Sequence, residues 1–310
     1  MRRTSVRLLL ALLPILAVAG CKSEGVLIGG TDGPRYTSLV SLSPSTTELV
    51  GRYGNWRLLK GRTAACDFPT FIEPVPVVAQ TKPDFEKIAG IAPDLVLYDE
   101  SLYNEADVER IKGLGAKEVF VITAQTVNEF IDQLYKFGAL VGGETNVSKY
   151  ADDILAAVEN AKADRRPGTP KVAILMGGPG SYYISGKSGF LGDVINLCGG
   201  ELVGPEGKEF QPANVESLIA LNPDLIMVAG GSAYEAMVAT PSDQPPPKWD
   251  KRTNDGSEAR AILADPQLQS IKAVKTGAVA AVASDVLLRR GARVHDLIKA
   301  TAATIVAVER

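Results

Sequence analysis

The sequence predicts an α/β protein made of two Rossmann-like lobes with mostly parallel sheets, joined by one long α-helix. The first observation behind this prediction is a repeat: Phe85–Leu95 (FEKIAGIAPDL) is matched 130 positions later by Val215–Leu225 (VESLIALNPDL). The second is an alternation of helix and strand patterns, which is typical of a parallel sheet wrapped by helices. The third is the segment 146–165, which has helical apolar spacing and no glycine or proline.

The repeat carries a helix followed by a strand. In each copy apolar residues recur at helical spacing, a proline then ends the helix, and an apolar run begins a strand. Each helix also carries one glutamate beside its apolar stripe, Glu86 in the first copy and Glu216 in the second. The succession of helix, proline and strand is common in α/β proteins, so the repeat suggests a duplicated plan, and the paired glutamates are its most specific part.

The first half of the domain begins with a short β-type run at Thr37–Leu42. Ser43 and Pro44 then supply a capping residue and a proline at the first position of a helix that runs to about Tyr53. The further elements predicted in this half are strand 94–98, helix 104–114 ended by Gly115, strand 117–122 and helix 127–141.

The segment 146–165 predicts a single helix of about five turns that links the two halves. A new strand begins at Lys171–Met176. The elements predicted after it are helix 190–197, helix 213–221, strand 224–228, strand 278–282 and a final helix 293–308. Ser232–Glu258 holds four prolines and has no clear period, which indicates an exposed insertion.

The N-terminus reads as an export signal. Three arginines precede an apolar core at 8–17, which is too short to span a bilayer as a helix. Val18-Ala19-Gly20-Cys21 resembles the lipobox of bacterial lipoproteins, which implies cleavage before Cys21 and a diacylglycerol on its sulfur. The alternative is an ordinary secretory signal followed by a cysteine without a lipid.

These patterns together predict the organisation of the chain. The predicted parts are a lipoprotein signal peptide at 1–20, a flexible tether at 21–35, an N-terminal α/β lobe at 36–143, a linking helix at 144–166 and a C-terminal α/β lobe at 167–310. Loss of residues 1–20 removes three arginines and moves the formal charge from −3 to −6. An acidic domain argues against nucleic acid as a partner, because phosphate binding needs a clustered basic surface.

Two cysteines remain after Cys21, namely Cys66 and Cys198, one in each half. A disulfide between them would have to join the two lobes. An exported protein meets an oxidising compartment, yet two buried free thiols are the simpler reading, and we expect both cysteines to be free.

Sequence patterns for catalysis are poor. Gly186-Lys187-Ser188 looks like the end of a phosphate-binding loop, but Ser181 stands where that loop requires glycine. Neither a nucleophile elbow nor a pair of zinc ligands at the usual spacing is found, and His295 is the only histidine. We therefore expect no cofactor and no protein-ligated metal; a metal ion would have to arrive inside an organic chelator.

Polar and aromatic residues follow several predicted strands, at the edge where open α/β sheets bind ligands. Aromatic rings there could stack on a flat ligand, and arginines could meet its acidic groups. The residues placed in this predicted cleft are Ser43, Ser45, Asp67, Phe68, Gln80, Tyr98, Asp99, Tyr103, Tyr182, Tyr183, Arg289, Arg290 and Arg293.

In their order and spacing, several segments resemble the class of bacterial ABC-importer substrate-binding proteins whose two lobes share one backbone helix, the cobalamin and ferric-siderophore type. The resemblance covers about Thr37–Ala307. The segments that carry it are Ser41–Glu48 (SLSPSTTE), Cys66–Pro69 (CDFP), Glu86–Leu95, Ser185–Lys187 (SGK), Cys198–Gly200 (CGG), Glu216–Leu225 and Ala273–Gly277 (AVKTG).

The resemblance implies a monomeric, exported and lipid-anchored protein on the periplasmic or outer face of the cell membrane. It implies that the protein passes a small-molecule metal chelate to an ABC permease and its ATPase, and that Glu86 and Glu216 face arginines of the permease. The CDFP loop looks most like the cobalamin branch. The family's disulfide partner for Cys198 is replaced by Ala302, which implies a free thiol.

The chain departs from this family at positions that bear on the ligand. Cobalamin binders often carry tryptophans where this chain has Gln80, Asp99 and Val286, and haem binders carry a tyrosine near Gln80. The ligand therefore stays open between a corrinoid and a ferric siderophore. Two alternatives use the same cleft: an exported α/β enzyme, which the missing catalytic sets disfavour, and a lipoprotein that senses ligand without transport.

Overall fold

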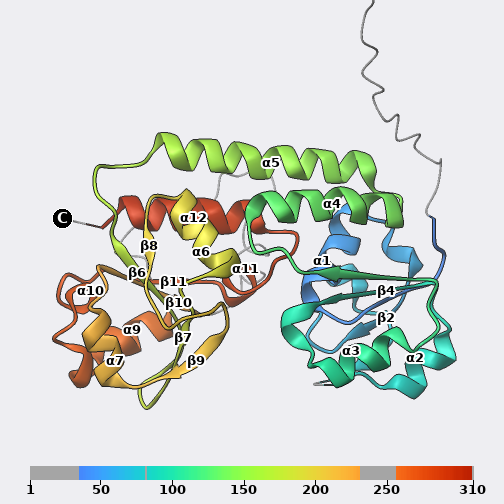
Figure 1. Ribbon diagram of the computed structural model, residues 1–310, viewed down its shortest axis with the longest axis horizontal. Coiled ribbons are helices and arrows are strands. Elements are labelled where there is room, and N and C mark those ends of the chain that lie inside the picture. Colours follow the sequence, from blue (N-terminus) through green and yellow to red (C-terminus); the bar gives the residue numbers. More distant parts are fainter. Residues whose placement is uncertain (1–34, 81, 231–255, 309–310) are drawn as a thin grey trace, which may run out of the picture. The chain divides into compact units, whose positions relative to one another are not determined.

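The computed structural model describes residues 35–80, 82–230 and 256–308, which form two α/β lobes, each with its own sheet (Figure 1). Both lobes belong to one compact unit, Thr31–Arg310. The predicted signal peptide, Cys21 and all of the tether except Arg35 lie outside the described residues. No helix in the described part of the chain is both long enough and apolar enough to cross a membrane.

The N-terminal sheet is fully parallel, in the order β3-β2-β1-β4-β5. Its central strands are buried and apolar, as expected for a sheet covered on both faces. Parallel strands place all their carboxyl ends at one edge, so the loops after them can form one site. The strands are β1 (Leu39–Ser41), β2 (Leu59–Thr63), β3 (Val77–Ala79), β4 (Leu95–Asp99) and β5 (Glu118–Ile122).

Helices cover both faces of this sheet. One face packs in a cluster with residues of α2 and α3, and the other packs in a larger cluster with residues of α1 and α4. The helices are α1 (Pro44–Tyr53), α2 (Phe85–Ile91), α3 (Glu105–Lys112) and α4 (Val127–Val141), with short 3-10 turns η1 (Trp56–Leu58), η2 (Thr70–Ile72) and η3 (Glu100–Leu102). The predicted bounds of α1 and α4 are confirmed; β2 and β3 were not predicted.

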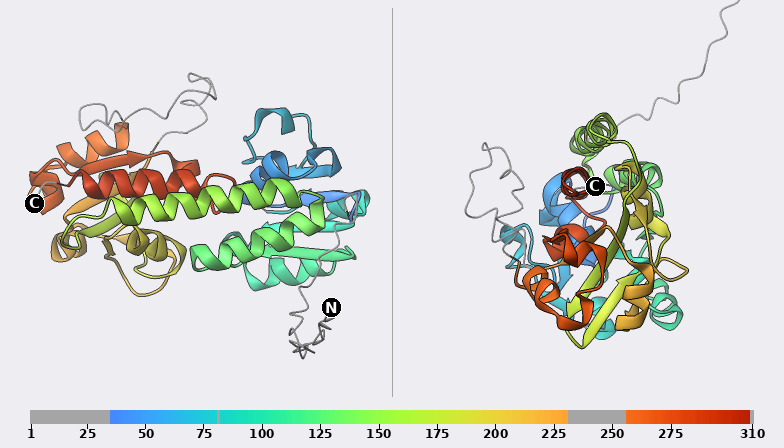
Figure 2. Two further views of the ribbon diagram at one scale, coloured as in Figure 1. Left: turned by 90° about the horizontal axis from the view of Figure 1, so that it is seen from above. Right: turned by 90° about the vertical axis from the view of Figure 1, so that its left-hand side faces the viewer.

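The linking helix is α5 (Glu144–Ala163). It starts at the first residue of the predicted linking range 144–166, two residues before the segment 146–165 with helical spacing, and it ends three residues before that range does. Its apolar stripe, from Val147 to Ala161, is buried. Figure 2 shows α5 lying along α4 and along the last helix, α12 (Val294–Val306), and both contacts are present in the structure. The linker is therefore packed on both lobes rather than suspended between them.

The C-terminal sheet is mixed, in the order β11-β10-β6-β7-β9, with β8 beside β6. Strand β7 is antiparallel to both of its neighbours, and the other pairs are parallel. The strands are β6 (Lys171–Gly178), β7 (Ser181–Ser185), β8 (Glu201–Leu202), β9 (Phe210–Ala213), β10 (Leu225–Ala229) and β11 (Val279–Val282). The remaining elements are α6 (Gly189–Leu197), α7 (Val215–Leu221), α9 (Ser257–Ala264), η5 (Pro266–Leu268), α10 (Lys272–Lys275) and α11 (Ser284–Leu287).

Residues Gly177–Gly180 form a hairpin between β6 and β7. Tyr182 and Tyr183 were predicted to follow a strand, and this was wrong, because both lie inside β7. Gly177 has φ +80°, and a Cβ there would lie 2.1 Å from the carbonyl oxygen of Ser181, so the hairpin needs glycine.

The predicted insertion Ser232–Glu258 falls mostly on residues 231–255, outside the described residues. Its last two residues were wrongly assigned, since Ser257 and Glu258 begin α9.

The apolar cores join the two lobes. Each lobe has an outer cluster of its own, and a larger cluster contains residues from both sheets and from α5. One continuous core thus includes residues of both sheets and of the linking helix, which contributes to the burial of both inner faces.

Candidate functional site

Ser43 and Ser45 stand at the carboxyl end of β1, as predicted, but both are buried. The Oγ of Ser43 accepts a hydrogen bond from the Thr46 amide at 3.2 Å, which caps α1, and lies 2.7 Å from the Thr46 hydroxyl. Pro44 occupies the first helical position. Ser43 therefore fixes the start of α1, and neither serine is exposed at the surface.

The loop 289–293, between α11 and α12, contacts the first lobe. Gly291 packs tightly on α1: a Cβ there would lie 3.0 Å from Oε2 of Glu48 and 3.1 Å from the carbonyl oxygen of Ser45, so a side chain would require these neighbours to shift. Tyr150 of α5 donates to the carbonyl oxygen of Gly291 at 2.7 Å and accepts from the Val294 amide at 2.9 Å. The linking helix thus holds the loop that brings three arginines to the first lobe.

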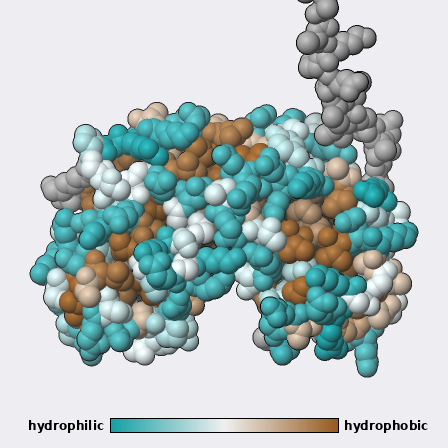
Figure 3. All heavy atoms as spheres, in the orientation of Figure 1, coloured by the Kyte–Doolittle hydropathy of each residue, from teal (hydrophilic) through white to brown (hydrophobic). Residues whose placement is uncertain are grey.

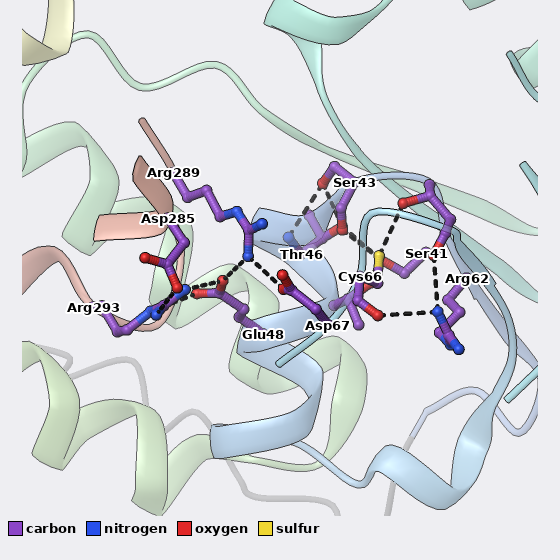
Figure 4. A network of polar contacts seen from close by, with 12 residues as sticks. Ser41, Ser43, Thr46, Glu48, Arg62, Cys66, Asp67, Asp285, Arg289 and Arg293 are labelled. Carbon is purple, nitrogen blue, oxygen red and sulfur yellow. Dashed lines mark hydrogen bonds and ion pairs between the residues drawn. The ribbon is translucent and has the colours of Figure 1, made fainter. Parts of the chain in front are cut away.

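Arg293 forms the buried centre of this contact (Figure 4). Its Nη2 donates to Oε1 of Glu48 at 2.5 Å, its Nε donates to Oε2 of Glu48 at 3.3 Å, and its Nη1 pairs with Asp285. All three side chains are almost fully excluded from solvent. A charge buried this deeply requires a partner, so Arg293 has a structural role here.

The pKa values in this group reflect that burial. Burial alone lowers the pKa of Arg293, but the charges of Glu48 and Asp285 outweigh it and raise that pKa. Burial raises the pKa of Glu48, and the guanidinium groups of Arg293 and Arg289 oppose that rise. We assign the pair as ionised, because Glu48 accepts charged hydrogen bonds from two arginines.

Arg289 lies between a buried and an exposed carboxylate (Figure 4). Its Nη1 donates to Oε1 of Glu48 at 2.9 Å and to Oδ1 of Asp67 at 2.8 Å. The side chain of Asp67 is 53% exposed, whereas that of Arg289 is 19% exposed. Phe68, next to Asp67, is buried with its ring centroid 4.7 Å from Cζ of Arg293, so it packs on the ion pair instead of offering a free ring.

Arg290 is bound where β4 and β5 end. Its Nη2 donates to Oδ1 of Asp99 at 2.5 Å and its Nη1 donates to the carbonyl oxygen of Ala124 at 2.7 Å. The same Asp99 oxygen accepts from the amide and the hydroxyl of Ser101. The structure therefore does bring all three predicted arginines to the first lobe, but it pairs each of them with protein carboxylates.

The predicted tyrosines differ in burial, and for the neighbours Tyr182 and Tyr183 the reason is that successive residues of a strand point to opposite faces of the sheet. Tyr98 and Tyr182 were expected after strand ends; they lie inside β4 and β7 with buried rings, and Tyr182 donates to Asp265 at 2.6 Å. Tyr103 is half-buried and donates to the carbonyl oxygen of Leu42 at 2.5 Å. Tyr183, on the opposite face of β7 from Tyr182, is 41% exposed. Gln80 is also exposed, at the end of β3.

The sequence analysis gave no role to five residues of this region. Glu48 and Asp285 accept hydrogen bonds from the arginines. Glu100 of the first lobe accepts from Lys208 of the second at 2.8 Å and from Gln125 at 3.2 Å. Glu48 lies in a helix segment in which all residues from Ser45 to Val50 are buried, so its carboxylate requires a partner inside the protein. The space-filling view shows the surface hollowed between the two lobes, on the side where α2 and α7 lie (Figure 3).

Glu86 and Glu216 are both exposed, in the first turns of α2 and α7. A carboxylate in the first turn of a helix is favoured by the helix dipole, and neither side chain is required for burial. Figure 1 draws the two helices on the same side of their lobes. Their exposure agrees with the prediction that both lie off the apolar stripe.

Cys66 and Cys198 are free and buried, as predicted. The Sγ of Cys66 lies 2.9 Å from the hydroxyl of Thr47 and 3.1 Å from that of Thr63, and burial raises the pKa of its thiol. Burial also raises the pKa of Cys198, to about 12. Within residues 35–80, 82–230 and 256–308, no group of three or more histidine, cysteine, aspartate or glutamate side chains is placed to hold a metal ion.

A family model described as periplasmic binding protein matches residues 39–286 of this chain. An ABC transporter substrate-binding lipoprotein of Bacillus subtilis, YvrC, is 25% identical over 275 residues, which cover 86% of this chain and 79% of that protein. The high-affinity heme uptake system protein IsdE of Staphylococcus aureus is 27% identical over 150 residues, 40% of this chain and half of that protein.

Solved structures share the fold. The vitamin B12-binding protein BtuF of Vibrio cholerae has a TM-score of 0.69 at 18% identity, with 88% of this chain and 99% of that chain covered. The heme-binding protein BhuT, in complex with two hemes, has a TM-score of 0.68 at 17% identity, with 87% and 98% covered. At these identities the likeness establishes the two-lobed architecture and does not by itself identify a ligand.

Proposed function

The chain belongs to the periplasmic binding protein family of ABC importers, and we propose that it captures a metal chelate between its two lobes and delivers that chelate to a permease. The observation that carries this proposal is the family match over residues 39–286. The protein is a transport protein and not an enzyme, which sets aside the alternative of an exported α/β enzyme.

One observation supports a chelate as the ligand: structural neighbours are described as binders of heme and of vitamin B12, which are both metal chelates. Of the three family positions at which this chain departs, Gln80 is exposed, Asp99 is bound to Arg290 and Val286 is buried, so none offers an aromatic ring to a ligand. Gln80 also supplies no tyrosine to ligate a heme iron, so a corrinoid or a ferric siderophore is kept as the proposed ligand.

The proposed location is the periplasmic or outer face of a cell membrane, with Cys21 carrying the lipid anchor. The lipobox-like sequence Val18–Cys21 and the relative named as a lipoprotein support this placement. Two acyl chains would hold the protein at the membrane, since each buried methylene contributes about 0.8 kcal/mol.

The proposed docking contacts to the permease are Glu86 and Glu216. Both are exposed on equivalent helices of the two lobes, and exposed charges chiefly steer and orient a partner. One carboxylate on each lobe would let the permease grip both lobes at once.

Binding of purified protein to cyanocobalamin, heme and a panel of ferric siderophores tests the ligand class. We expect submicromolar binding of at least one corrinoid or ferric siderophore by calorimetry. Absence of binding to every member of the panel would overturn the uptake function as stated.

Charge reversal tests the docking contacts. The double variant Glu86→Arg with Glu216→Arg should abolish uptake by whole cells and leave ligand affinity unchanged. Glu105→Arg is the matched control, because Glu105 is also an exposed glutamate in the first turn of a helix. Loss of ligand affinity in the double variant would place these glutamates in the binding site instead.

A further inference from the structure

Arg289 and its two carboxylate partners differ in how firmly they are held. Glu48 lies inside α1 and is buried, and it also binds Arg293 at 2.5 Å. Asp67 lies in the loop after β2 and meets the same Nη1 of Arg289 at 2.8 Å from the solvent side. Figure 4 shows Arg289 between the two, with Asp67 on the side away from Arg293.

The formal charges of this cluster show what Asp67 adds. Arg289 and Arg293 carry two positive charges, and the buried carboxylates of Glu48 and Asp285 carry two negative charges. The buried part is therefore balanced before Asp67 is counted. Asp67 adds one negative charge, and it does so at the exposed side of an arginine that could otherwise meet an anion from solvent.

We expect this outer contact to contribute little to the stability of the fold. An exposed ion pair contributes little to stability, because water solvates the separated charges almost as well. The pair formed by Arg290 and Asp99 is different, because both side chains are largely buried and both make further hydrogen bonds. Of the arginine contacts to the first lobe described above, the one to Asp67 is the most exposed.

We propose that Asp67 is a specificity-determining residue: its carboxylate occupies the outward side of Arg289 and disfavours ligands that bear anionic groups there, so that neutral or cationic chelates bind better than polycarboxylate chelates. The claim about ligands rests on the proposed function. The electrostatic effect of Asp67 on Arg289 does not, and it can be measured with a simple anion.

The test compares wild-type protein with Asp67→Asn, which keeps the size of the side chain and removes its charge. Citrate is the probe, titrated by calorimetry, with thermal unfolding as a second readout. We expect Asp67→Asn to bind citrate about tenfold more tightly than wild type, the order of effect of one unit charge at close range in a partly solvated site. The double variant Asp67→Asn with Arg289→Gln should lose the gain.

Asp132→Asn is the matched control, since Asp132 is an exposed aspartate on α4 of the same lobe. It should bind citrate as wild type does. Equal citrate binding by Asp67→Asn and wild type would overturn the proposal, and so would an equal gain in Asp132→Asn, which would reflect net charge alone.

A second arm measures the affinities for ferric citrate and for cyanocobalamin, an anionic and a neutral chelate. The ratio of the two should shift toward ferric citrate by about tenfold in Asp67→Asn. If wild type binds neither chelate nor any member of the wider panel, the proposed function fails while the citrate result still decides the role of Asp67. A loss of affinity for the neutral chelate would make Asp67 a direct ligand contact and would overturn the proposal.

Discussion

The segments Phe85–Leu95 and Val215–Leu225 build the same unit in different lobes. Each forms a seven-residue helix with one buried side chain, Ile88 in α2 and Leu218 in α7. Each helix is capped by the residue before it, since Asp84 accepts from the Lys87 amide at 3.1 Å and Asn214 from the Ser217 amide at 2.8 Å. Both copies therefore have the same N-terminal cap, although the capping residue is aspartate in one and asparagine in the other.

The aspartates of the two copies also make equivalent long-range contacts. Asp94 accepts from the Thr37 amide at 3.1 Å and pairs with Lys117 at 2.8 Å. Asp224 accepts from the Lys171 amide at 2.8 Å and pairs with Lys272 at 2.6 Å. In both lobes, therefore, the aspartate ties the start of a neighbouring parallel strand. The repeat is a repeat of tertiary structure, which supports a duplicated plan more strongly than four identical letters do.

The copies differ where their helices end. Ala92 and Asn222 both adopt the left-handed conformation, with φ of 49° and 43°. Alanine is strained there, whereas asparagine tolerates it. Asn222 also accepts a hydrogen bond from the Lys272 amide at 2.9 Å. The second copy thus has a better helix end than the first.

The largest effect that tests this equivalence is expected in the apolar stripe. Ile88→Ala and Leu218→Ala should each lower the free energy of unfolding by about 2–5 kcal/mol, because each removes a buried side chain and leaves a cavity. Urea unfolding followed by circular dichroism measures both. Ile219→Ala is the control on α7, because Ile219 is 39% exposed and should change stability far less. A cost below 1 kcal/mol at either buried site would break the comparison.

Exchanging the residues at the two helix ends should change the free energy of unfolding in opposite directions. Ala92→Asn should raise the free energy of unfolding by about 0.5–2 kcal/mol, since it relieves strain at a helix cap. Asn222→Ala should lower it by about 1–2 kcal/mol, through the same strain and the lost hydrogen bond to Lys272.

Both helix-end variants are measured by urea unfolding at neutral pH. Ala92→Gly serves as a second variant, since glycine adopts positive φ without strain and should also stabilise. If Ala92→Asn and Ala92→Gly both destabilise the protein, the left-handed end of α2 is not a strained position and the difference between the copies has another origin.

Much of the backbone could be predicted because apolar spacing and capping residues act locally. The helix Val127–Val141 and the start of α1 at Pro44 follow directly from such signals. Strands β2 and β3 could not be found in this way: LKGRT carries two basic residues, and VVA is only three residues long. Their place in the sheet depends on pairing with distant residues, which a local pattern does not contain.

The candidate site was harder to predict for a related reason. Sequence position brought Arg289, Arg290 and Arg293 to the right region, because loops after parallel strands converge. It did not show what they contact, since Glu48 and Asp99 lie about 190 to 245 residues away along the chain. A guanidinium that becomes buried must find a carboxylate, so arginines that seemed available for a ligand were instead paired within the protein.

The smallest expected effect is the dependence on pH of the stability that Asp94 and Asp224 contribute. The hydrogen bonds from Lys117 and Thr37 lower the pKa of Asp94. Burial alone raises the pKa of Asp224, but the contacts with Lys272 and the Lys171 amide outweigh it and lower that pKa. A carboxyl group whose pKa is lowered by folding stabilises the fold above its unfolded pKa, about 3.9 for aspartate, and that contribution is lost as the pH falls through the folded pKa.

Asp94→Asn and Asp224→Asn should therefore be less stable than wild type at pH 7. The gap, which is the difference in free energy of unfolding between wild type and variant, should narrow as the pH is lowered below about 4. Urea midpoints measured from pH 7 to pH 2.5 follow this gap. Because the two aspartates make equivalent contacts, the two gaps should close in the same direction and over the same acidic range. In Lys117→Gln the carboxylate of Asp94 keeps its contacts with Thr37. The loss of stability of Lys117→Gln relative to wild type at pH 7 should therefore be smaller than that of Asp94→Asn. A gap that stays constant down to pH 2.5 in one copy and closes in the other would show that only one aspartate ties its strand through an ionised carboxylate.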